Sequence, residues 1–247
     1  MIVGLEEVIM TRYEVVSSTY LAFSFLGLAL LTILTFSIPS SSSTTSLQPQ
    51  FFGSFFIIIC VSGMLAGIYP SKCLGKSSKS GNAPPTKAGF EREEGTSMVF
   101  DGHHPACGNF SSHVIYFKGG SYCAGCTGLV FGALISASGT ALFIISGVQV
   151  GGYVTAIFLL GFAGVTLGLL QYNLHADRAL PHLLLNVAFV VGAFLIFLAV
   201  MGKGSTLLGS YSMGLTVYWI VARILSSRTG HKRICNHCET RSCSHQS

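Results

Sequence analysis

The sequence predicts an all-α integral membrane protein, built as a bundle of six transmembrane helices with a small cytoplasmic hairpin loop stapled by a metal ion. Half of the 247 residues are hydrophobic, only 9% are charged, and the mean hydropathy is +0.63. A soluble domain carries roughly 25% charged residues, so this composition belongs to the membrane class. Six apolar runs approach the roughly 20 residues that a helix needs to cross a bilayer. They cover residues 18–39, 51–69, 127–147, 151–170, 180–201 and 206–225.

The basic residues predict the orientation of this bundle. One precedes the first run, six lie between the second and third, one lies between the fourth and fifth, and five follow from Arg223 onward, so that only Lys203 of the 14 is on the other side. Because loops rich in Lys and Arg face the cytoplasm, both termini of a multi-pass protein in the plasma membrane are expected there. The net charge of +5 then fits a cytoplasmic membrane face and needs no nucleic-acid partner.

Composition divides the chain into five segments. The second of them is rich in Lys, Ser, Gly and Pro and has few apolar residues to bury, which is typical of a flexible linker. The segments are a two-span hairpin (1–70), the cytoplasmic linker (71–97), a cytoplasmic Cys/His knuckle (98–126), a four-span bundle (127–226) and a cytoplasmic Cys/His tail (227–247).

The knuckle holds the most specific chemical pattern in the chain. Two ligand-type residues are separated by two others, fifteen residues follow, and a Cys-x-x-Cys pair comes next. This is a paired-knuckle zinc pattern, since two such residues in a tight turn can wrap one ion. An iron–sulfur cluster is less expected because it more usually takes four cysteines. The predicted ligands are His104, Cys107, Cys123 and Cys126, with His103 and His113 as alternates.

The setting of the knuckle also favours a metal. Cysteines that face a reducing cytosol rarely form stable disulfides, so paired cysteines there indicate metal or redox chemistry. Residues 112–117 are strand-like and residues 118–121 resemble a turn that leads to Cys123. A segment of so few residues needs a staple, such as a bound metal ion, in order to fold. A reactive dithiol, or cysteines with no ligand at a loop–helix junction, are the alternatives.

The tail carries a second, weaker pattern. It offers four ligands within eleven residues, but it is terminal, short and rich in Ser and basic residues. A tail with neither metal nor fixed structure is the main alternative. The ligands of this second site would be Cys235, Cys238, Cys243 and His245.

The most polar helix end follows the fourth apolar run. Gln171 and His175 are four residues apart and share a helix face, and Asp177 lies two residues beyond His175. Asp177 and His175 are candidates for a second shell around the metal, in which a carboxylate orients a histidine. The alternative is that these residues only end a span at the membrane interface.

Small residues at four-residue spacing predict close helix packing within the bundle rather than a dimerisation motif. Cys60, inside the second run, is expected to be a small core residue. The spaced sets are Gly63/Gly67, Gly128/Gly132/Ser136 and Gly164/Gly168.

The knuckle also carries a resemblance, in the motifs HHPAC and CAGCTG of residues 103–128. These are similar to a family of small uncharacterised prokaryotic multi-span membrane proteins, with Cys-His-x-x-Pro followed by Cys-x-Arg-Cys-Thr-Gly at the start of a membrane helix. Gly102 stands where that family has its first Cys, and Gly125 where it has Arg. The resemblance covers residues 102–197 and implies a multi-span membrane protein without naming an activity.

These patterns favour a non-enzymatic membrane scaffold, sensor or assembly factor with a structural zinc site, partnered by the bilayer, a cytoplasmic protein and further copies of itself. The alternatives are a membrane metallohydrolase or thiol oxidoreductase using Cys123 and Cys126 with His175 and Asp177, or a metal-handling or transport protein. The run interiors lack the Asp, Glu, Lys and His residues that ion-coupled transporters place near the midplane. No phosphate-cradling glycine loop, HExxH or GxSxG motif is present.

Overall fold

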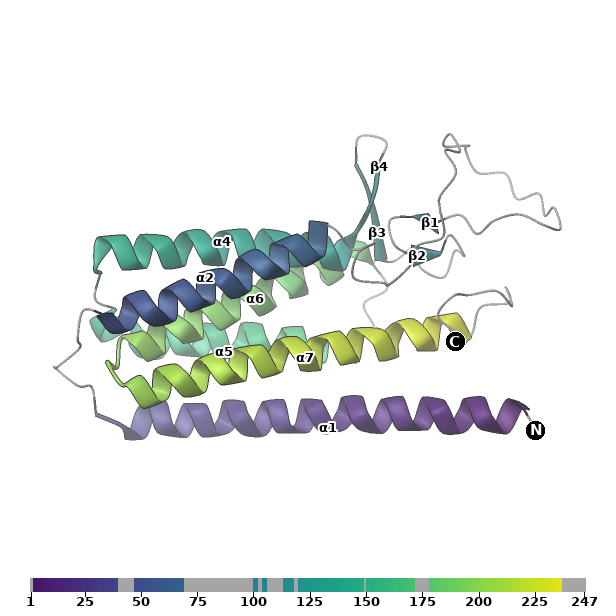
Figure 1. Cartoon of the computed structure of the whole chain (residues 1–247), viewed down its shortest axis with the longest axis horizontal. Helices are drawn as coiled ribbons and strands as arrows, with labels where there is room; N and C mark the ends of the chain where they lie inside the picture. Colours follow the sequence, from purple (N-terminus) through teal and green to yellow (C-terminus); the bar gives the residue numbers. More distant parts are fainter. Residues whose placement is uncertain are drawn as a thin grey trace.

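The computed structural model describes residues 2–39, 47–68, 100–101, 104–105, 113–117, 120–148, 150–171 and 178–236. Within these segments the chain forms six long α-helices, one short 3-10 helix and four short strands (Figure 1). The helices are α1 (Ile2–Ser37), α2 (Leu47–Ile68), α4 (Ala124–Ser146), η2 (Gly151–Tyr153), α5 (Val154–Leu170), α6 (Ala179–Met201) and α7 (Thr206–Asn236).

The strands form two antiparallel pairs before α4. β1 (Phe100–Asp101) pairs with β2 (His104–Pro105), and β3 (Val114–Phe117) pairs with β4 (Gly120–Cys123). The strand predicted over residues 112–117 is therefore confirmed for Val114–Phe117, while Ser112 lies outside the described residues and His113 precedes the strand. The predicted turn over residues 118–121 was too long, because its last two residues pair with Phe117 and Tyr116 as the start of β4.

The predicted membrane character holds for five of the six long helices that the structure describes. Five are long and apolar enough to cross a bilayer, by length and composition. The sixth predicted span, over residues 206–225, lies in α7, which is not among them. Its Ser, Thr, Gly and Tyr residues and Arg223 lower its hydropathy, although the helix is long. The five apolar segments are Tyr13–Ser37, Gln48–Ile68, Ala124–Ser146, Gly151–Leu170 and Ala179–Met201.

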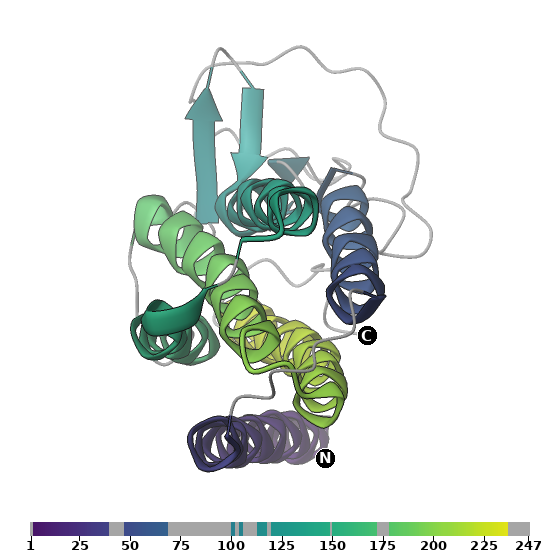
Figure 2. The ribbon, with the colours of Figure 1, turned by 90° about the vertical axis from the view of Figure 1, so that its left-hand side faces the viewer.

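The helices run up and down around α6. α6 packs against α4 on one side and α5 on the other, α2 packs on α4, and α1 packs on α7 (Figure 2). The N-terminal end of α1, the C-terminal end of α7 and both strand pairs lie at one end of the bundle (Figure 1). At about 1.5 Å per residue, α1 and α7 are longer than the roughly 30 Å hydrocarbon core. Figure 1 shows that both extend past the other helices at that same end, called the knuckle end below.

Glycines set the close contacts of α6, as the small-residue spacing predicts. A Cβ atom added to Gly128 of α4 would overlap the Leu183 carbonyl oxygen, and one added to Gly164 of α5 would overlap the Ala188 carbonyl oxygen. Gly63 differs, because nothing lies within 4 Å of its Cβ position. The packing interpretation therefore holds for α4 and α5 against α6 and fails at Gly63.

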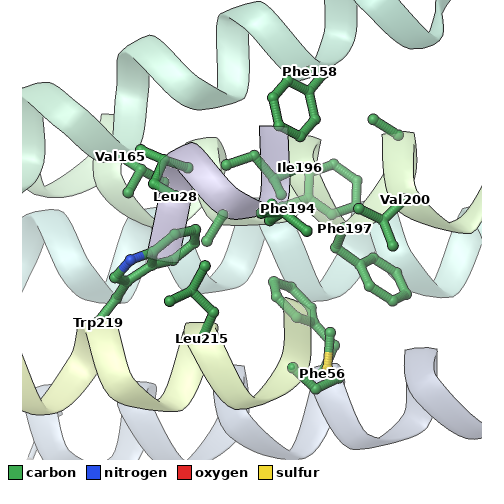
Figure 3. Close-up of a cluster of buried hydrophobic side chains, with 14 of the residues drawn as sticks. Leu28, Phe56, Phe158, Val165, Phe194, Ile196, Phe197, Val200, Leu215 and Trp219 are labelled. Carbon is green, nitrogen blue, oxygen red and sulfur yellow. The ribbon is translucent and has the colours of Figure 1, made fainter. Parts of the chain in front are cut away.

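An apolar core fills the middle of the bundle (Figure 3). Phe56 of α2 stacks on Phe197 of α6 with ring centroids 5.1 Å apart, and Trp219 of α7 is only 1% exposed. Cys60 is buried in the same cluster, as predicted. Large apolar side chains elsewhere on the helices are exposed, such as Ile145 at 82%, which suits a surface covered by lipid.

Candidate functional site

The Cys-x-x-Cys pair lies where the last strand becomes a membrane helix. Cys123 ends β4 and is the N-terminal cap residue of α4, and Cys126 lies in the first turn of that helix. Both side chains are partly exposed. Cys123 has extended backbone and stands three residues before Cys126, at the entrance to the first turn. The helix dipole stabilises negative charge at such an end, which suits thiolate ligands.

The strand pairing brings His113 to the same place. Val114 pairs with Cys123 across β3 and β4, and His113 directly precedes Val114. The His113 ring lies over the ring of His182 on α6, with centroids 4.4 Å apart. His113, an alternate ligand in the sequence-based prediction, is therefore next along the chain to the residue that pairs with Cys123, and its ring packs on α6.

The rest of the predicted first site is only partly within the described residues. His104 lies in β2, paired through its backbone with Asp101. Cys107 and His103 are outside the described segments. Across the part of the chain that the structure describes, no three or more His, Cys, Asp and Glu side chains are grouped so that they could hold a metal ion. The zinc staple therefore stays a prediction.

The tail and the predicted second shell lie mostly outside the described residues as well. Cys235 is in the last turn of α7, which continues to Asn236. Three tail ligands, Cys238, Cys243 and His245, and both second-shell candidates, His175 and Asp177, fall outside.

The structure instead assembles a buried polar cluster from three helices at the knuckle end. Arg223 of α7 is only 6% exposed, and its Nη2 donates to Gln171 Oε1 at 2.5 Å and to Asn186 Oδ1 at 2.7 Å. Gln171 at the end of α5 is 1% exposed, as is Asn186 of α6, and His182 of α6 is 5% exposed. We call Arg223, Gln171, Asn186 and His182 the arginine cluster.

Arg223 fixes the hydrogen-bond direction of the whole cluster. A guanidinium only donates, so both amides must turn their oxygen atoms toward it. Gln171 Nε2 then faces His182 Nδ1 at 2.6 Å, and this ring nitrogen has to accept the bond. Asn186 Nδ2 likewise donates to the His182 carbonyl oxygen at 2.6 Å. His182 is therefore a neutral imidazole that carries its proton on Nε2.

The arginine cluster adjoins the cysteine pair through Gly125. A Cβ atom on Gly125 would lie 3.6 Å from Asn186 Nδ2 and 3.8 Å from Cys123 Sγ. The ring of His182 also contacts the ring of His113, which directly precedes β3 of the hairpin. One contiguous region thus joins the N-terminal end of α4, the base of the hairpin, the C-terminal end of α5 and the N-terminal end of α6.

Sequence reasoning found part of this cluster and missed the rest. Gln171 belongs to the polar helix end that the sequence indicates, but His182, Asn186 and Arg223 were not singled out as site residues. The available signal was that Arg223 is the first charged residue inside any predicted span and that Asn186 interrupts an apolar run. In lipid, such polar groups are expensive unless they meet partners.

No protein-family model, curated protein or solved structure matches the chain. The resemblance to a prokaryotic membrane-protein family stays a prediction.

Proposed function

We propose that the protein is a multi-pass membrane scaffold, sensor or assembly factor in which a structural zinc site at the knuckle end shapes a surface for a cytoplasmic protein. The observation that carries the proposal is the position of Cys123 and Cys126. Cys123 is the N-terminal cap residue of a membrane helix, Cys126 lies in the first turn of that helix, and both side chains are partly exposed. Thiolate and imidazole are the ligands that zinc prefers.

A structural role is favoured over a catalytic one by the ligand set. His104, Cys107, Cys123 and Cys126 would close a tetrahedral shell, whereas catalytic zinc keeps one position for water. The neighbouring arginine cluster also supports a structural role. Arg223 donates to both side-chain amides, and Asn186 donates to the His182 carbonyl oxygen of α6, so these bonds brace the helices behind the cysteines.

The charge distribution supports the location. Thirteen of the 14 basic residues belong to the side that carries both termini and the knuckle, so we place this side in the cytoplasm at the plasma membrane. A second copy of the chain is a further expected partner.

The test compares two cysteine variants. Cys126→Ser removes a proposed ligand and should release zinc and lower the thermal stability of the purified protein. Cys60→Ser alters a buried cysteine of α2 outside the site and should leave the zinc content unchanged. Full zinc retention by Cys126→Ser would remove this residue from the ligand set and contradict the proposal.

A thiol oxidoreductase is the second candidate, because Cys123 caps a helix with Cys126 three residues on. In that reaction the two thiols would become one disulfide, while a substrate disulfide would become two thiols. Thiol counting after incubation with a disulfide of low molecular weight separates the candidates. The zinc hypothesis predicts that the three thiols of Cys107, Cys123 and Cys126 are protected and react only after chelation. The redox hypothesis predicts rapid oxidation that His175→Ala slows.

A further inference from the structure

The hairpin of β3 and β4 stands across the bundle rather than along it. In Figure 1 its strands run at a steep angle to the helix axes. Figure 2, viewed along those axes, shows the hairpin extending beyond α4 and away from the other helices. If the helices cross a bilayer, the hairpin therefore extends sideways over the region that lipid occupies next to α4.

The hairpin joins the bundle at the position along the helix axes where the apolar segment of α4 begins. Cys123 ends the hairpin, and the apolar segment Ala124–Ser146 begins at the next residue. The exposed surface of α4 continues from there as lipid-facing side chains, including Phe131 at 53% and Leu134 at 52% exposed. The hairpin thus lies at the boundary between the hydrocarbon and the polar head groups.

Three side chains that the structure describes as exposed on the hairpin are aromatic. Tyr116 is 68% exposed, Phe117 62% and Tyr122 52%. The pairing of Ile115 with Tyr122 places these two on one face with Phe117, while Tyr116 lies on the other. Val114, at the base, is buried and holds the hairpin to the bundle. Tyrosine and other amphipathic rings concentrate at the membrane–water interface.

We propose that the β3–β4 hairpin is an interfacial membrane anchor, whose aromatic side chains enter the head-group layer beside α4. The occupant of this surface is the bilayer itself, continuous with the lipid that covers α4. The anchor fixes the height of Cys123 at the membrane surface, whichever ligand the cysteines hold. It stands independently of the zinc proposal, since it depends only on the hairpin and on the membrane setting of α4.

The test is a fluorescence measurement on Phe117→Trp in reconstituted vesicles. Trp219 is the one native tryptophan and is buried, so the parent protein supplies the background emission. Brominated lipids should quench most of the added emission, and acrylamide in the water should quench little of it. Leu134→Trp, on the lipid-facing side of α4, is the positive control for lipid quenching.

Two outcomes would overturn the anchor. Strong acrylamide quenching without lipid quenching would place the hairpin in water, and protection from both quenchers would mean that a second copy of the protein covers it. Tyr122→Trp repeats the measurement on the neighbouring strand, so a failure of Phe117→Trp to fold does not decide the result.

Discussion

Two regions of the molecule bury polar side chains between helices, and they do so differently. In the arginine cluster, the Arg223 cation of α7 donates to Gln171 Oε1 at the end of α5 at 2.5 Å and to Asn186 Oδ1 of α6 at 2.7 Å. Along the contact of α1 with α7, neutral donors form longer bonds, such as Tyr211 Oη to the Gly27 carbonyl oxygen at 3.1 Å and Trp219 Nε1 to the Ser24 carbonyl oxygen at 3.5 Å. Charge-assisted bonds are shorter and roughly twice as strong as neutral ones.

The hydrogen-bond acceptors also differ between the two regions, and this difference matters more than the difference in bond length. The carbonyls of Gly27 and Ser24 belong to an α-helix and are bonded within it, so they stay satisfied when a side-chain donor is removed. Among the described residues, the donor to the side-chain amide oxygens of Gln171 and Asn186 is Arg223. We expect the arginine cluster to behave as one unit and the α1–α7 contact as a set of small, separate contributions.

The largest expected effect is that of Arg223→Leu. It leaves two buried amide oxygens without the donor that they share, at about 1–3 kcal/mol each, so the free energy of unfolding should fall by about 3 kcal/mol. The measurement is reversible unfolding in mixed micelles. Arg228→Leu is the matched control, because Arg228 lies five residues on in α7 and is exposed. It should change stability by less than about 0.5 kcal/mol, and an equal loss in both variants would contradict the cluster's role.

A double-mutant cycle of Arg223→Leu with Gln171→Leu should give a coupling free energy of about 1–3 kcal/mol, because the two residues are in direct contact. The same cycle with Tyr211→Phe should give less than about 0.5 kcal/mol, since Tyr211 is more than three helical turns away on α7. Equal couplings in the two cycles would mean that the cluster is no more cooperative than the α1–α7 contact.

The smallest expected effect is that of Tyr211→Phe alone. It removes one neutral bond to a carbonyl that the helix already satisfies, so a loss of about 0.5–1 kcal/mol is expected in the same unfolding assay. Tyr153→Phe serves as its control, because Tyr153 is 75% exposed and should show no change. A loss from Tyr211→Phe as large as that from Arg223→Leu would erase the difference between the two regions.

The apolar helices and the arginine cluster differ in how far the sequence predicts them. Long apolar runs predict α1, α2, α4, α5 and α6, because burial in lipid needs little beyond length and hydropathy. The polar helix end containing Gln171 is equally visible. Its partners are not, since Arg223 lies 52 residues away along the chain and Asn186 is a single amide inside an apolar run. Only the packing of α6 against its neighbours brings these side chains together.

The arrangement of the knuckle shows the same limit. The cysteine spacing predicts a pair of zinc ligands, and the strand-like residues before this pair predict the hairpin. The register of β3 and β4 is needed to pair Val114, the neighbour of His113, with Cys123. The contact between His113 and His182, which joins the hairpin to the arginine cluster, depends on where α6 begins.

The most direct test of the proposed zinc site is X-ray absorption at the zinc edge on the purified protein. We predict about one zinc per chain, with three sulfur atoms at about 2.3 Å and one imidazole nitrogen at about 2.0 Å. These would come from Cys107, Cys123, Cys126 and one histidine. Protein with no stoichiometric metal, or zinc bound by nitrogen and oxygen alone, would contradict the proposal.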